Sequence, residues 1–142
     1  MQIIKCMVAS KQKVIRNGVA LILGSAENIQ VIGNNGADVV KETFELQPDL
    51  LVYELSPEEK NNFEVLIKVK DLCGWTKLIL FSSTPLNKED LKQYLSVCDG
   101  YMQGPLIPGF LLKSMELACY SGHFFFLGLK HTFWHPTDLK SH

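Results

Sequence analysis

The stretch Pro48-Asp49-Leu50-Leu51-Val52-Tyr53-Glu54-Leu55 decides the fold, because it is an apolar run that lies between two helical patterns. A run of this length, rich in strand-forming residues, predicts a buried strand of a parallel sheet. One acid, Glu54, stands at its C-terminal end. In open α/β sheets the carboxyl ends of the strands hold ligands and chemistry. Glu54 is therefore a candidate site residue, although a solvated strand-end carboxylate is the simpler interpretation.

Segments with strand character and segments with helical spacing alternate on both sides of this stretch. Strands are predicted over residues 3–9, 28–33, 48–55, 77–82 and 100–103, and helices over 11–25, 37–46, 56–72, 88–97 and 108–121. Ser10 is expected to cap the first helix, and Ser56-Pro57 to begin the third. This alternation predicts an α/β domain with a parallel sheet, helices on both faces and right-handed crossovers.

Length and composition exclude several classes of protein. The chain has 142 residues, 46% of them hydrophobic and 20% charged, which is typical of one globular domain. A net charge of −1 without a basic block argues against nucleic-acid binding by this segment. The apolar runs are too short to span a membrane, and the N-terminus lacks the layout of a signal peptide. We expect a cytoplasmic protein whose four scattered cysteines are buried, reduced thiols: Cys6, Cys73, Cys98 and Cys119.

The residues after Gly122 differ from the rest of the chain. Residues 1–122 are expected to form the domain, and 123–142 an aromatic-rich tail or the start of a linker to an output domain. The tail carries Phe124-Phe125-Phe126 and Phe133-Trp134, which could cover the last helix or await a partner. Its three histidines have no metal-binding spacing and are expected to be ordinary surface residues: His123, His131 and His135.

Several segments resemble the receiver domain of bacterial response regulators, most of all the LuxR/NarL group. They are Met7 to Gly18, Asn35-Gly36-Ala37-Asp38, Gln47 to Leu55, and Gly100-Tyr101-Met102-Gln103-Gly104-Pro105. The resemblance covers about residues 3–122. It implies a flavodoxin-like, doubly wound, five-stranded parallel sheet of order 2-1-3-4-5.

The residues that carry receiver chemistry are replaced. The resemblance places Ser10 and Lys11 where two Mg²⁺-binding acids belong, Glu54 at the phosphoacceptor aspartate, and Gly104 at the conserved lysine. The switch hydroxyl and aromatic of the family are retained as Ser82 and Tyr101, which suggests that the face they serve is still used. The following proline is retained as Pro105, and its peptide bond could be cis, as it often is in the family.

These replacements all oppose phosphoryl transfer. That reaction needs a metal to neutralise charge and align oxygens, and one acid beside a lysine is a poor Mg²⁺ site. Glutamate is longer than aspartate, which displaces the carboxylate by about 1.5 Å. Two interpretations of Lys11 stay open: a solvated lysine, or an ammonium that takes the metal position and pairs with Glu54. The sequence therefore predicts a pseudo-receiver with no metal and no cofactor.

Three functions are compatible with these residues to different degrees. The first is a phosphorylation-independent regulatory module of signalling or transcription, not an enzyme, acting as a homodimer or through a partner regulator or output domain. The alternative is a small-molecule sensor with its ligand in the metal-free crevice at the strand ends. The third, an active phosphotransfer domain, is opposed by the missing acids. The glycines lack the spacing of a P-loop or a dinucleotide fingerprint.

Overall fold

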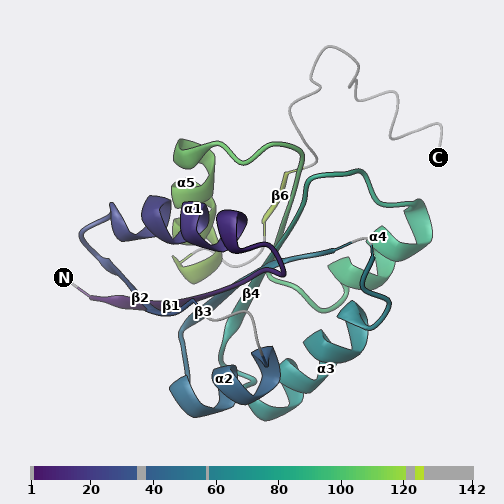
Figure 1. Ribbon diagram of the computed structural model, residues 1–142, viewed down its shortest axis with the longest axis horizontal. Coiled ribbons are helices and arrows are strands. Elements are labelled where there is room, and N and C mark those ends of the chain that lie inside the picture. Colours follow the sequence, from purple (N-terminus) through teal and green to yellow (C-terminus); the bar gives the residue numbers. More distant parts are fainter. Residues whose placement is uncertain (1, 35–37, 57, 121–123, 127–142) are drawn as a thin grey trace.

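The computed structural model describes residues 2–34, 38–56, 58–120 and 124–126. Strands and helices alternate along these residues (Figure 1). The strands are β1 (Ile4–Ala9), β2 (Ile29–Gly33), β3 (Leu50–Glu54), β4 (Lys77–Ser82), β5 (Gly100–Gln103) and β6 (Phe124–Phe126). The helices are α1 (Lys13–Gly24), α2 (Val39–Leu46), α3 (Asn62–Leu72), α4 (Lys88–Leu95) and α5 (Pro108–Tyr120).

All strands belong to one parallel sheet of order β2-β1-β3-β4-β5-β6. Helices α1 and α5 lie on one face of the sheet, and α2, α3 and α4 lie on the other (Figure 1). The order of the first five strands confirms the predicted 2-1-3-4-5 arrangement with helices on both faces. Strands β1 and β3 are neighbours in the interior of the sheet, so their carboxyl ends lie side by side.

Strand β6 was not predicted, since the sequence indicated only five strands. Phe124–Phe126 pairs in parallel with β5, and Tyr101 lies opposite Phe125. A three-residue apolar run has no period that would distinguish a strand from a cover or a patch. The division at residue 122 stays a prediction. His123, His131, Phe133, Trp134 and His135 lie outside the described residues.

Alternate residues of β3 supply the hydrophobic clusters on the two faces of the sheet. Leu50 and Val52 pack on the face that α1 and α5 cover, whereas Leu51 and Tyr53 pack on the opposite face. All five residues of β3 are buried, which confirms the prediction from the opening stretch. Burial of each large apolar side chain contributes about 1.5–3 kcal/mol, so this strand anchors both layers.

The predicted helix starts at Ser10 and Ser56 were wrong. Helix α1 begins at Lys13 after the N-cap Gln12, and no side chain caps it. Helix α3 begins at Asn62, because residues 58, 60 and 61 lie in turns and the Glu59 N–H donates to the Ser56 carbonyl at 3.1 Å. Asn62 is buried and donates its side-chain Nδ2–H to the Ser56 carbonyl at 2.9 Å. Serine before a helical pattern indicated a cap at both positions. Instead, the Ser10 hydroxyl donates to Glu54, and the Ser56 carbonyl accepts from Asn62.

The cysteines are free thiols: Cys6, Cys73 and Cys98 are buried, and Cys119 is half-buried. This burial agrees with the prediction. Within the described ranges, every helix is too short or too polar to cross a lipid bilayer.

Candidate functional site

The site lies at the carboxyl ends of β1 and β3. Ala9 is opposite Tyr53 in the sheet, so the next residues along the two strands, Ser10 and Glu54, meet. The Ser10 hydroxyl donates a hydrogen bond to Glu54 Oε1 at 2.5 Å, within the range of short O–H···O⁻ bonds. Both residues are buried, with 5% and 7% of their surface exposed. Glu54 is therefore a buried side chain that accepts a hydrogen bond from a serine hydroxyl, which corrects the solvated-carboxylate interpretation.

The Ser10 hydroxyl is oriented by the backbone that follows it. The Gln12 N–H donates to Ser10 Oγ at 3.0 Å, which leaves the hydroxyl proton to be donated. Ser10 Oγ is 3.3 Å from the Gln12 carbonyl, farther than from Glu54. Arg16 Nη1 also donates to the Ser10 carbonyl at 2.9 Å, so α1 fixes this residue from its other side.

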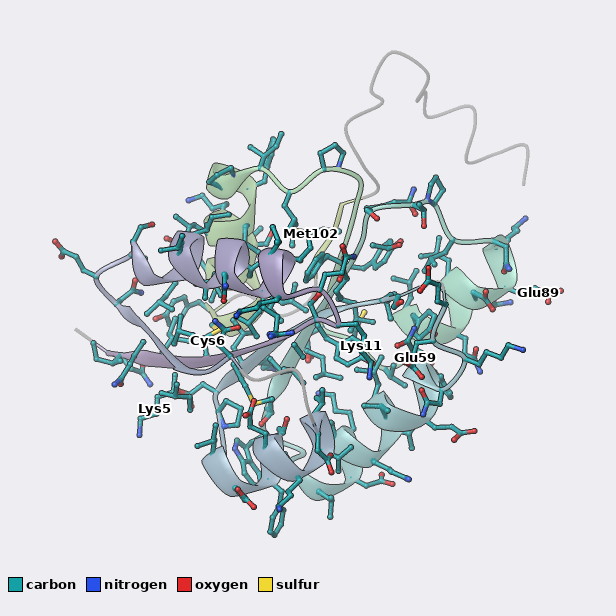
Figure 2. All side chains as sticks on the ribbon, viewed as in Figure 1. Lys5, Cys6, Lys11, Glu59, Glu89 and Met102 are labelled. Atoms are coloured by element: carbon teal, nitrogen blue, oxygen red, sulfur yellow. The ribbon has the colours of Figure 1, made fainter. Side chains whose placement is uncertain are left out.

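Lys11 does not pair with Glu54, so that interpretation was wrong. Its Nζ lies 3.5 Å from Glu59 Oε2, and 61% of its side chain is exposed. Figure 2 shows Lys11 and Glu59 beside each other. Keeping the ammonium in water avoids the cost of burying a charge next to Glu54. An exposed pair of this kind contributes at most about 1 kcal/mol.

Tyr53 and Asn62 form a wall of the site. The Tyr53 hydroxyl donates to Asn62 Oδ1 at 2.8 Å, and both side chains are buried. Burial raises the pKa of the Tyr53 phenol, and the nearby Tyr94 and Glu59 act in the same direction. The phenol therefore stays a neutral donor at physiological pH. Sequence reasoning missed Asn62, because a lone asparagine after a turn carries no signal of burial.

The crevice at this site has a volume of about 20 Å³, which is room for about one water molecule. Its lining residues are Ala9, Ser10, Lys11, Val39, Tyr53, Glu54, Ser56 and Asn62. Glu54 is the one buried carboxylate among them, and Ser10 binds it. In the part of the chain that the structure describes, no three His, Cys, Asp or Glu side chains are grouped to hold a metal. These residues do not fit Mg²⁺, which needs several oxygen ligands and retains waters.

Ser82 and Tyr101 lie on the neighbouring strands β4 and β5. The Ser82 hydroxyl donates to the Thr84 carbonyl at 2.6 Å. The Tyr101 side chain is completely buried, and its hydroxyl donates to Gln103 Oε1 at 2.9 Å. Burial raises the pKa of Tyr101 to about 12, and the neighbouring Ser82 side chain acts in the opposite direction. Gln103 was also missed by sequence reasoning, which considered only the serine and the tyrosine.

Gly104 has a backbone conformation that suits glycine alone. Its φ is 102°, and its N–H donates to the Ser82 carbonyl at 2.9 Å. Residues with a side chain rarely adopt this φ, so a lysine at this position would be strained. The bond to Pro105 is trans, because the described residues contain no cis peptide, and the suggested cis bond is not found.

The structure thus brings Ser10 and Glu54 into contact, with Lys11 at the rim of the crevice. The hydrogen bonds of Ser82, Tyr101 and Gly104 are made on the β4–β5 side. The predicted site residues therefore divide into two clusters on adjacent strand ends.

No family model matches the chain. The curated relatives include the response regulator protein VraR of Staphylococcus epidermidis, 26% identical over 101 residues, or 70% of this chain and 48% of the relative. The nitrate/nitrite response regulator protein NarL of Escherichia coli is 26% identical over 106 residues, which are 73% of this chain and 49% of the relative. The chain spans about half the length of the curated relatives it matches.

Solved structures show the same fold. The receiver domain of RcsB from Salmonella enterica serovar Typhimurium, in the presence of phosphomimetic BeF3−, matches with a TM-score of 0.75 and 17% identity. That match covers 87% of this chain and 94% of the other. The signal receiver domain of the response regulator NarL from Mycobacterium tuberculosis gives a TM-score of 0.71 at 16% identity, covering 84% and 98% of the two chains. The chain has the receiver-domain fold, and its sequence is similar to response regulators of signal transduction.

Proposed function

We propose that this chain is a receiver-like regulatory module of signal transduction that acts through protein–protein contacts and does not use phosphorylation. The observation that carries this proposal is the Ser10–Glu54 hydrogen bond. It involves the residue at the phosphoacceptor position and a residue at the metal-binding position. A carboxylate that already accepts a short hydrogen bond in a buried setting is a poor nucleophile for a phosphoryl group.

The size of the crevice supports the same proposal. A phosphoryl group with its Mg²⁺ needs far more room than about 20 Å³, and phosphoryl transfer depends on that metal. The same volume counts against a small-molecule ligand in the crevice, since ligand sites commonly have volumes of about 300–1,000 Å³. The sensor alternative is therefore not favoured.

The test is treatment of the intact chain with acetyl phosphate and millimolar Mg²⁺, followed by mass spectrometry. We expect no added phosphoryl mass and no change in melting temperature with Mg²⁺ alone. A receiver with a complete acid pair, treated in parallel, is the positive control. Stable phosphorylation of Glu54, or saturable Mg²⁺ binding at physiological concentration, would overturn the proposal.

We also propose that α5 mediates a homodimer. Of the apolar residues on this helix, Leu111, Met115 and Ala118 are buried against the sheet. Phe110, Leu117 and Tyr120 remain 47%, 39% and 59% exposed, respectively, and lie on the outer side of the helix. These three exposed apolar residues follow one another along the helix at spacings of seven and three, so they form one stripe.

The charges on α5 favour a second copy of the chain as the occupant of this stripe. Lys113 and Glu116 lie between Phe110 and Leu117, 3.3 Å apart, with 69% and 55% of their side chains exposed. In an antiparallel, two-fold pair of α5 helices, Lys113 of one copy faces Glu116 of the other, and the apolar residues meet on either side. A surface that is complementary to itself is what a two-fold dimer requires.

We expect light scattering after size exclusion to give a mass near twice 16.0 kDa. Glu116→Lys should weaken the dimer about tenfold, because like charges then face each other across the two-fold axis. The swapped variant Lys113→Glu/Glu116→Lys should restore it, since the opposite charges meet again. A wild-type chain that stays monomeric at high concentration contradicts this proposal, as does a swapped variant as weak as Glu116→Lys.

A further inference from the structure

Strand β6 covers the outer edge of β5 and is the last strand of the sheet among the described residues. Its residues Phe124, Phe125 and Phe126 lie opposite Gly100, Tyr101 and Met102. Among the described elements, β6 packs mainly on β5 and on α5, the helix that precedes it (Figure 1). The β5–α5–β6 segment is a parallel crossover that places the chain on the edge beside Tyr101.

The register defines which backbone groups β6 can satisfy. The Leu55 N–H donates to the Phe81 carbonyl at 2.8 Å, so Phe81 is directed towards β3 and its neighbour Leu80 towards β5. Tyr101 lies opposite Leu80 in the parallel pair, and its N–H and carbonyl therefore point away from β4, towards β6. By the same alternation Phe126 directs its N–H towards β5, and Phe125 directs its N–H outwards.

A chain of contacts leads from this edge to α4. The buried Tyr101 hydroxyl donates to Gln103 Oε1, and the same oxygen accepts the Leu86 N–H at 3.4 Å. Leu86 lies in the loop that enters α4, a helix in which no residue is fully buried. A helix with so little burial depends on its connections for its position. These hydrogen bonds connect β5 with the loop that leads into α4.

The short length of β6 makes it a candidate for local opening. Three residues at one edge of the sheet form few hydrogen bonds, and edge strands separate from a sheet at a lower free energy than central strands do. When such a strand leaves, the backbone groups of the strand beneath become free to pair with another chain.

We propose that β6 is a switch strand. Docked on β5, it holds the Tyr101 backbone, the Gln103–Leu86 contact and the start of α4 in place; undocked, it exposes the β5 edge for an extended segment of a second copy of this chain. The most suitable segment is β6 of that copy, because it has the sequence that the edge already binds. This inference rests on the proposed function, because it supplies a switch for a domain that is not phosphorylated.

Two proline variants of the full chain test this inference. Phe126→Pro removes the N–H that points at β5, whereas Phe125→Pro removes the outward N–H and is the matched control, since an edge strand tolerates proline on its outer side. We expect the Tyr101 and Leu86 amides to exchange about tenfold faster in Phe126→Pro than in Phe125→Pro, measured by nuclear magnetic resonance. Amides of β1 and β3 should exchange equally in both variants.

Native-state exchange of the wild-type chain is the second measurement. The Tyr101 amide should exchange through local opening and be less protected than the Val52 amide of β3. If β6 of a second copy pairs with β5, the protection of the Tyr101 amide should rise with protein concentration. Equal protection of Tyr101 and Val52, equal exchange in the two proline variants, or complete unfolding of Phe126→Pro would overturn the inference. The acetyl phosphate experiment tests the proposed function separately, because it reads mass at Glu54 and not exchange at β5.

Discussion

Replacing Ser10 by alanine is expected to lower the free energy of unfolding by about 2 kcal/mol and the melting temperature by roughly 5–10 °C. The Ser10 hydroxyl donates to Glu54 Oε1 at 2.5 Å, and both residues are buried. Its removal leaves a buried carboxylate oxygen without this donor in a crevice that holds about one water molecule. A hydrogen bond to a buried charged group is worth more than an ordinary one, which makes this a large effect for the loss of one oxygen.

The control for this effect is Ser96→Ala. Ser96 donates its hydroxyl to the Gln93 carbonyl at 2.6 Å, but it lies on the surface at the end of α4. We expect its loss to change stability by less than about 0.5 kcal/mol. Thermal and urea unfolding of both variants decide the matter, and an effect of Ser10→Ala no larger than that of Ser96→Ala would contradict the role of Ser10.

A double-mutant cycle then attributes the effect to the pair. Glu54→Leu in the Ser10→Ala background replaces both partners by apolar groups, which should recover part of the lost stability.

Glu54→Gln should alter stability more than Glu58→Gln, because Glu54 is buried whereas Glu58 is exposed. Lys11→Ala should have little effect, since Lys11 pairs only with Glu59 at the rim among the described residues.

The sequence predicted the architecture well, because the architecture depends on a coarse pattern. The apolar run over β3 and the alternation around it required a parallel sheet, and the resemblance supplied the order of five strands. Burial of β3 followed from its composition alone. These features depend on many residues at once, so no single error could change them.

The geometry of the site was not predictable in the same way, because single side chains had competing partners. Ser10 precedes a helix and was interpreted as a cap, yet its hydroxyl donates to Glu54, a residue that the register of β1 and β3 brings opposite it. Pairing of Lys11 with Glu54 was one of two open interpretations, because the sequence does not show that Glu59 is the partner. Which partner wins depends on register and on the cost of burying charge, and neither is encoded locally.

Strand β6 shows a different limit of the sequence pattern. Phe124-Phe125-Phe126 was assigned to a tail with two open roles, a cover for the last helix or a surface for a partner, because three apolar residues lack the length that identifies a strand. Its position follows from pairing with the outer edge of β5, which exists only once the sheet has assembled. Tertiary structure, and not propensity, decided this element.

Substituting Gly104 by alanine is expected to lower the free energy of unfolding by about 1–3 kcal/mol. Its φ of 102° lies outside the regions open to residues with a Cβ atom. The Gly104 N–H donates to the Ser82 carbonyl, so this conformation also fixes the end of β5 against β4. Alanine must either adopt the strained φ or move this hydrogen bond, and both cost stability.

Gly18→Ala is the matched control, because it makes the same chemical change in a different backbone. Gly18 lies within α1, and a Cβ built there would meet no atom within 4 Å. Alanine favours the helix over glycine, so this variant should gain about 0.5–1 kcal/mol. If urea unfolding shows that Gly104→Ala lowers the free energy of unfolding and Gly18→Ala raises it, the role of φ at Gly104 is confirmed. Changes of the same sign in the two variants would contradict it.

Gly104→Lys extends this comparison to the chemistry of the site. It restores the residue type that the resemblance places at this position, but at a φ that opposes any side chain. We expect a loss of stability similar to that of Gly104→Ala and still no phosphoryl mass after acetyl phosphate and Mg²⁺, because Ser10 and Lys11 provide no acids for the metal. Phosphorylation of Gly104→Lys would mean that the missing lysine alone had silenced the site. Neither the backbone of β5 nor the Ser10–Glu54 hydrogen bond would then prevent phosphorylation. The proposal of a phosphorylation-independent module would have to rest on Gly104 alone.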